Sequence, residues 1–152
     1  MITKKHVMLI ALGACLVGLS VLGSTKNPVE RPFKGVNHQT LVITLDNNGV
    51  PVVWEVFGTA NCTHLGLSEN QGGGTYNQDG TPKGTGVLTA ANGDQLFWSG
   101  GVATAFTGGT GRFEGATGTV TTVSMEIVFR PDSPPGTLVG DIVIYNEGTI
   151  TY

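Results

Sequence analysis

Charged side chains are scarce in this chain. Only 12% of the 152 residues are Asp, Glu, Lys or Arg, whereas 39% are hydrophobic. A disordered chain of this length would carry more charge and less apolar surface, so a folded domain is expected. The 8 basic side chains are outnumbered by 11 acidic ones, and this balance argues against nucleic acid as a partner.

Cysteine is almost absent, with Cys15 and Cys62 as the two examples. Cys15 lies in the apolar N-terminal segment, so a processed chain would keep Cys62 alone and could form no intrachain disulfide. The domain must then depend on its hydrophobic core. Cys62 is expected to be a small buried residue, with a reactive thiol as the alternative.

The chain has one long apolar run, residues 7–22, and two lysines precede it. This order is typical of a secretory signal peptide. Val21 and Gly23 are small enough for the −3 and −1 positions of a signal peptidase site. We therefore expect residues 1–23 to be a signal peptide with a helical core, followed by a polar linker over residues 24–31, and a protein that is secreted or periplasmic.

Two other interpretations of the N-terminus stay open. Residues 12–15 read Leu-Gly-Ala-Cys and resemble a bacterial lipobox, which would make Cys15 a lipidation site and the protein a membrane-anchored lipoprotein. Alternatively, the run is retained as an anchor, although it is shorter than the roughly 20 residues that span a bilayer. The membrane is thus expected as a partner only through this segment or a lipidated Cys15.

Helical periodicity is missing after residue 30, and period-two runs rich in Val, Ile, Thr and aromatic residues recur between turn signals. This pattern predicts an all-β domain over residues 32–152. Asn48-Gly49, Asn92-Gly93 and Asn146-Glu147-Gly148 each predict a hairpin, because glycine after asparagine supplies the positive φ of a tight turn.

About eight antiparallel strands are expected in total, one of them at Arg112–Ala116. The Gly-rich stretch Ser68–Gly86 is expected to be a mobile hairpin tip. Without helices to cover a face, these strands must close into a barrel or pack as a two-sheet sandwich.

Several segments carry a resemblance to a known family. Residues 108–113 read Gly-Gly-Thr-Gly-Arg-Phe, which resembles the GGTG(K/R)F segment of dirigent proteins and the wider allene oxide cyclase-type barrel superfamily. Residues 63–66, 90–94 and 148–152 are similar to an uncharacterised subgroup of small exported bacterial proteins with this barrel. The resemblance implies a calycin-like, eight-stranded antiparallel barrel with an apolar interior, often trimeric, that binds small hydrophobic molecules.

The enzyme activities of that superfamily do not follow from the resemblance, because its acidic and polar catalytic residues do not align with this chain. A homotrimer is nevertheless a natural expectation, since the strand around Trp54 is apolar on both faces. An interior cavity is the other explanation of that double apolar character. A cavity wall could be formed by the large apolar residues of the strands, namely Trp54, Phe57, Leu96, Trp98, Phe106, Met125 and Tyr145.

Acid–base or nucleophilic chemistry would need Glu55, Cys62, His64 or Asp141 inside such a cavity. Glu55 lies within a strand and would have a raised pKa if it pointed inward; a solvent-facing carboxylate is the simpler interpretation. Cys62 and His64 share a face if the chain is extended between them. The histidines and Cys62 have no metal-ligand spacing, so neither a metal nor a cofactor is expected.

Three functions therefore stay open. Binding of a small hydrophobic ligand, such as a fatty acid or a terpenoid, leads. A structural or assembly protein of the cell envelope is the second, and a cyclase- or isomerase-type enzyme the third, with the balance leaning away from catalysis. A cavity of several hundred Å³ would favour the first and third, and a filled interior the second.

Overall fold

The computed structural model describes residues 27–152 apart from residue 102. The predicted signal peptide, its cleavage after Gly23 and the lipidation of Cys15 lie outside the described residues. Residues 27–29 have no regular structure and the first strand begins at Glu30, so Glu30 and Arg31, which were expected in the linker, belong to the barrel. No helix in the described part of the chain is long and apolar enough to cross a membrane.

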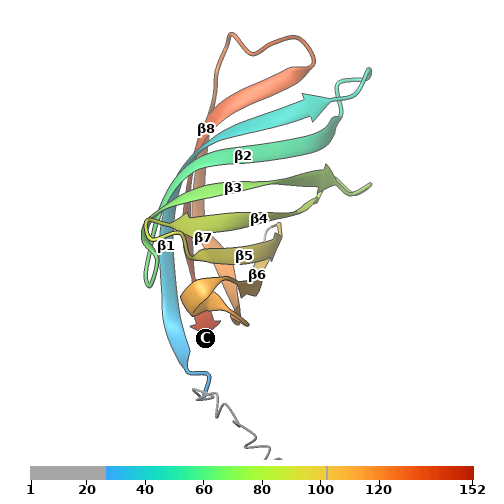
Figure 1. The fold of residues 1–152 in the computed structure, drawn as a ribbon. Helices are drawn as coiled ribbons and strands as arrows, with labels where there is room; N and C mark the ends of the chain where they lie inside the picture. The colour runs from blue at the N-terminus through green and yellow to red at the C-terminus, as the bar shows by residue number, and fades with distance from the viewer. Residues whose placement is uncertain (1–26, 102) are drawn as a thin grey trace, which may run out of the picture.

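Eight antiparallel strands close into a barrel in sequence order, with β8 pairing back onto β1. The predicted all-β, eight-stranded antiparallel barrel is thereby confirmed. In Figure 1, β2 to β6 lie one above the next while β1 and β8 run steeply past them. The strands are β1 (Glu30–Leu45), β2 (Pro51–Cys62), β3 (Gly66–Tyr76), β4 (Pro82–Ala90), β5 (Gln95–Gly100), β6 (Ala103–Gly109), β7 (Thr117–Phe129) and β8 (Thr137–Thr151).

Alternation along β1 and β2 decides which of their side chains face the interior. In β1 the odd-numbered residues from Phe33 to Ile43 are buried, and in β2 the even-numbered Trp54, Val56, Ala60 and Cys62 are buried. Because successive strand residues point to opposite faces, one parity fills the barrel and the other covers it.

Two of the three predicted hairpin turns are confirmed. Gly49 has φ 80° between β1 and β2, and Gly93 has φ 87° between β4 and β5. Both are left-handed conformations that a residue without Cβ adopts at low cost. The Asp46 carboxylate also accepts hydrogen bonds from the backbone N–H groups of Asn48 and Val50, each at 2.8 Å, and so braces the first turn.

The third hairpin prediction is wrong, because β8 continues without a turn from Thr137 to Thr151. Gly148 lies within the strand, and a Cβ there would collide with the backbone of Thr119 and Val120 on β7. Glycine at this position therefore allows a close approach between β7 and β8 and does not form a turn.

Two further expectations are also wrong. Arg112–Ala116 is no strand, because the short 3-10 turn η1 (Gly111–Phe113) leads into the β6–β7 connection. Ser68–Gly86 is no mobile tip, because most of it forms β3 and β4, joined by a turn over residues 77–81. The high glycine content of this stretch suggested a loop, although the stretch forms strands.

The interior contains two groups of packed side chains. One group centres on the fully buried Phe113, Leu96 and Ile150, and includes residues of the β2–β3 and β6–β7 connections. The other contains Leu41, Ile43, Trp54, Val56 and Ile142. Trp98 contacts both groups.

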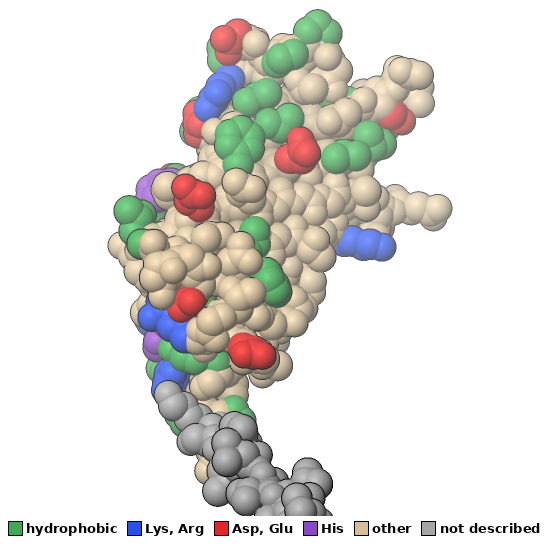
Figure 2. Space-filling model, in the orientation of Figure 1, with side chains coloured by type: hydrophobic (Ala, Val, Ile, Leu, Met, Phe, Trp, Pro, Cys, Tyr) green, Lys and Arg blue, Asp and Glu red, His purple; other side chains and the backbone are tan. Residues whose placement is uncertain are grey.

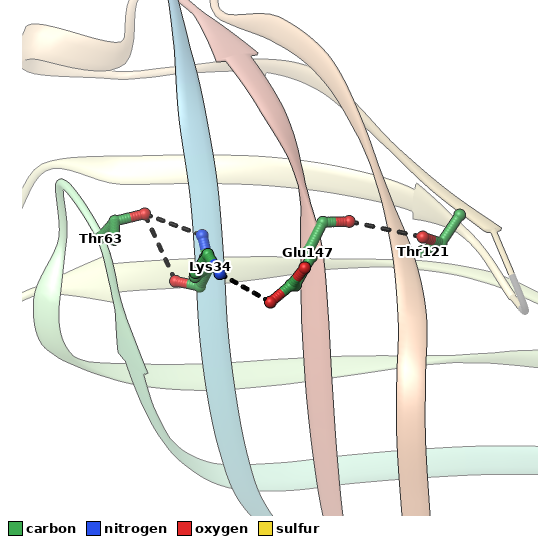
Figure 3. Close-up of polar contacts among 4 residues, drawn as sticks. All are labelled: Lys34, Thr63, Thr121 and Glu147. Atoms are coloured by element: carbon green, nitrogen blue, oxygen red, sulfur yellow. Dashed lines mark hydrogen bonds and ion pairs between the residues drawn. The ribbon is translucent and has the colours of Figure 1, made fainter.

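Outer-surface contacts join the strands around the closing pair β1–β8. Figure 3 shows Lys34 on β1 between the Thr63 hydroxyl and the Glu147 carboxylate of β8. The Lys34 Nζ–Glu147 Oε1 distance is 2.8 Å, but both side chains are more than half exposed, so the ion pair adds little stability. Closure therefore depends on the backbone ladder and the interior packing.

Candidate functional site

A cavity of about 230 Å³ lies inside the barrel, between the two groups of packed side chains. Its wall is mainly apolar and includes residues of both groups, such as Phe33, Leu88, Phe106, Leu41 and Ile142. Side chains therefore do not fill the interior of the barrel completely.

Two tryptophans form a flat part of this wall. Trp54 and Trp98 stack at 6.3 Å between ring centroids with an interplanar angle of 12°. They come from β2 and β5 and lie across the two strands between them. A ring-shaped ligand would meet a continuous aromatic surface here.

Glycines on β3 and β4 make room for these indoles. Gly86 lies opposite Trp98 in the β4–β5 ladder, and Gly72 lies opposite Gly86 in the β3–β4 ladder. A Cβ at either glycine would collide with the Trp98 ring, and a Cβ at Gly84 would meet the Trp54 ring. The absence of Cβ atoms in this Gly-rich stretch thus leaves the space that the two indole rings occupy.

Polar side chains also line the cavity, with Asn37, Gln39 and Asn70 on β1 and β3 and Thr104, Thr122 and Asn146 on β6, β7 and β8. The buried polar residues of the described chain are Asn37, Gln39, Ser68 and Asn70, and all four lie on β1 and β3. Trp98 Nε1 donates to Asn70 Oδ1 at 3.2 Å, and Asn70 Nδ2 donates to Asn37 Oδ1 at 3.1 Å. This chain of hydrogen bonds fixes the Trp98 ring.

Two buried donors in the same wall lack this support. Gln39 and Trp54 are only 6% and 7% exposed, and Gln39 Nε2 and Trp54 Nε1 have no hydrogen-bond partner among the described residues. Both residues line the cavity. An unpaired buried donor costs free energy, so each of these groups needs an explanation.

The titratable groups of the wall are neutral at physiological pH. Burial raises the pKa of the Cys62 thiol to about 12 and also raises the pKa of Tyr76. Among the described residues that line the cavity, none is Asp, Glu, His, Lys or Arg. The cavity thus offers apolar contact and neutral hydrogen bonds, and it has no ionised acid or base.

Four of the seven residues expected in the cavity wall are there: Trp54, Trp98, Phe106 and Met125 line the cavity. The other three lie elsewhere. Phe57 and Tyr145 are on the outward parity of β2 and β8 and are 51% and 43% exposed. Leu96 is fully buried among the packed side chains around Phe113.

The candidate catalytic residues are not brought together. Glu55 lies on the outward parity of β2 and is exposed, which agrees with the simpler, solvent-facing interpretation of the sequence. Asp141 is on the outer surface of β8, where Arg130 Nη2 lies 2.6 Å from its Oδ1. The hydrogen bond from Arg130 lowers the pKa of Asp141.

Cys62 and His64 also lie in different surroundings. Cys62 is buried and faces the cavity. His64 lies in the turn after β2, where it has φ 72° and its Nε2 lies 2.9 Å from the Pro32 carbonyl oxygen. The bend at this turn removes the shared face that an extended chain would give, so the two do not form a nucleophile–base pair.

Sequence reasoning missed Gln39, Asn37 and Asn70. Their signal was present in β1, where Asn37 and Gln39 occupy the same parity as Phe33, Leu41 and Ile43. Polar residues on the inward parity of a strand indicate a polar feature inside the barrel.

Comparison of the chain with family models and with curated proteins gives no match. In the described part of the chain, no three His, Cys, Asp or Glu residues are grouped in a way that could hold a metal ion. The function must therefore be argued from the cavity.

Proposed function

We propose that the barrel binds a small, mainly hydrophobic molecule in its interior cavity. The observation that carries this proposal is the combination of a hollow apolar interior with two buried donors, Gln39 Nε2 and Trp54 Nε1, that no described residue satisfies. A purely structural barrel would gain stability from a filled interior and from apolar residues at these positions.

The chemistry of the wall supports binding over acid–base catalysis. A cyclase or isomerase needs a proton donor or acceptor beside the reacting atoms. Glu55, His64 and Asp141 do not line the cavity, and the Cys62 thiol stays protonated because its pKa is raised to about 12. The N-terminal sequence pattern supports a binder that acts after export.

The cavity volume sets the size of the ligand. A cavity of about 150 Å³ accommodates benzene, with its six non-hydrogen atoms, so 230 Å³ suits a molecule with roughly ten non-hydrogen atoms. Apolar burial contributes about 0.8 kcal/mol per methylene, while association costs at least about 4 kcal/mol. Ten methylene-sized groups would contribute about 8 kcal/mol, which leaves about 4 kcal/mol after association, so we expect dissociation constants near 1 mM for simple hydrocarbons of this size.

Calorimetric titration with the bicyclic hydrocarbon tetralin tests the proposal. Binding should change the tryptophan fluorescence, because Trp54 and Trp98 are the two tryptophans of the chain and both line the cavity. Silent calorimetry together with unchanged fluorescence, for tetralin and for its ketone 1-tetralone alike, would refute ligand binding in the cavity.

A matched pair of variants locates the site. Val56 faces the cavity, whereas Val53 on the same strand faces outward and is 38% exposed. Val56→Phe should fill part of the cavity and abolish tetralin binding, and Val53→Phe should leave binding unchanged. Equal binding by both variants would place the tetralin site outside the barrel.

A further inference from the structure

The two unpartnered donors restrict the chemistry of the ligand beyond its hydrophobicity, and this step rests on the binding function proposed above. Gln39 Nε2 and Trp54 Nε1 are both N–H donors, and each is buried beside the cavity without an acceptor among the described residues. Trp98, the other tryptophan, already donates to Asn70. An indole N–H can only donate, and the unpaired atom of Gln39 is its amide nitrogen, so each of the two positions offers a donor to the cavity.

The electrostatics of the wall add a second restriction. The described residues that line the cavity include no Lys, Arg or His, so a carboxylate that entered would lose its hydration without gaining a cation. Burying an unpaired charge costs far more than burying a hydrogen-bonded neutral group. A neutral acceptor avoids this cost.

We propose that the ligand is an uncharged, compact and largely apolar molecule with a carbonyl-type acceptor oxygen, and that Gln39 and Trp54 are the residues that recognise this oxygen. The flat Trp54–Trp98 surface favours a ring system as the apolar body. The same wall disfavours fatty-acid anions, because it holds no cation to pair with a carboxylate.

Three probes with one ring skeleton separate these properties: tetralin has no acceptor, 1-tetralone has a carbonyl group, and tetralin-1-carboxylate is an anion at pH 7. Calorimetry should show that the carboxylate binds at least about tenfold more weakly than 1-tetralone, because its charge has no partner. Equal affinity for the ketone and the anion would overturn the proposed neutrality.

The Gln39→Leu variant tests the role of the donor. Loss of one hydrogen bond should weaken 1-tetralone binding by about three- to tenfold, while tetralin binding should be unchanged or tighter. The ratio of the two affinities corrects for the different hydrophobicity of the probes. If Gln39→Leu changes both affinities by the same factor, Gln39 does not recognise the oxygen.

Indole N–H resonances test Trp54 in the unmodified protein, and a variant is needed only to assign the signals. The two tryptophans give two such signals, which Trp98→Phe assigns. Addition of 1-tetralone should shift the Trp54 signal downfield as its N–H gains an acceptor, and tetralin should not. Equal shifts with both probes would overturn the role of Trp54, whereas absence of binding by any probe would overturn the proposed function itself.

Discussion

Replacement of the buried, polar Gln39 by leucine should make the unliganded protein more stable. Gln39 is 6% exposed and its Nε2 has no partner among the described residues. An unsatisfied buried donor costs about 1–3 kcal/mol, and leucine removes this cost while adding apolar contacts. We expect the free energy of unfolding to rise by about 1–2 kcal/mol.

Urea unfolding followed by tryptophan fluorescence measures this change. Gln71→Leu is the matched control, because Gln71 is exposed on the outward parity of β3 and its replacement should alter stability by less than about 0.5 kcal/mol. A fall of 1 kcal/mol or more in Gln39→Leu, relative to the Gln71→Leu control, would refute the reasoning, because it would show that Gln39 stabilises the unliganded barrel.

Other substitutions test other parts of the account. Gly86→Ala should lower the free energy of unfolding by about 1–3 kcal/mol, because its Cβ collides with the Trp98 ring and with the neighbouring strand. This loss should be smaller in a Trp98→Phe background. Equal losses in both backgrounds would contradict the role of Gly86 in making room for Trp98. Gly93→Val should cost about 1–2 kcal/mol, from its φ of 87° alone, since no atom lies within 4 Å of the new Cβ; an unchanged melting midpoint would count against that turn. The free energy of unfolding should fall as pH rises from about 9 toward about 12, since unfolded Cys62 ionises before the buried thiol does, and Cys62→Ala should flatten this dependence. Finally, the exposed Phe57 on β2 predicts self-association through the outer surface, so sedimentation equilibrium should show an oligomer that Phe57→Glu weakens, and monomer alone at micromolar concentration would contradict it.

The all-β architecture could be predicted because it depends on local patterns. Period-two alternation in β1 and β2, and Asn-Gly pairs at Gly49 and Gly93, act over a few residues. Local patterns gave the wrong prediction at Gly148 and over Ser68–Gly86, because several glycines there are required by close contacts with other strands. A glycine in a turn and a glycine under a distant indole look alike in the sequence.

The cavity wall could be predicted only in part. Trp54 and Trp98 were identified by size and strand position, but Phe57 and Tyr145 were misplaced because parity cannot be assigned when both faces of a strand are apolar. Gln39 could not be predicted as a site residue, because its role depends on the lack of a hydrogen-bond partner for Nε2, and only the folded interior shows this lack.

Figure 2 shows hydrophobic side chains among polar and acidic ones on the outer surface, more densely toward the upper end of the view. The large exposed apolar residues include Val52, Val53 and Phe57 on β2 and Val128 and Phe129 on β7. These side chains explain why both faces of some strands are apolar, and they are separate from the cavity wall except where Met125 contributes to both.

The most direct test of the central claim is a crystal structure of the protein with 1-tetralone. The account predicts the ligand inside the barrel, against the Trp54–Trp98 surface, with its carbonyl oxygen about 3 Å from Gln39 Nε2 or Trp54 Nε1. Ligand bound only on the outer surface, or an interior closed by side chains that satisfy both donors, would contradict it.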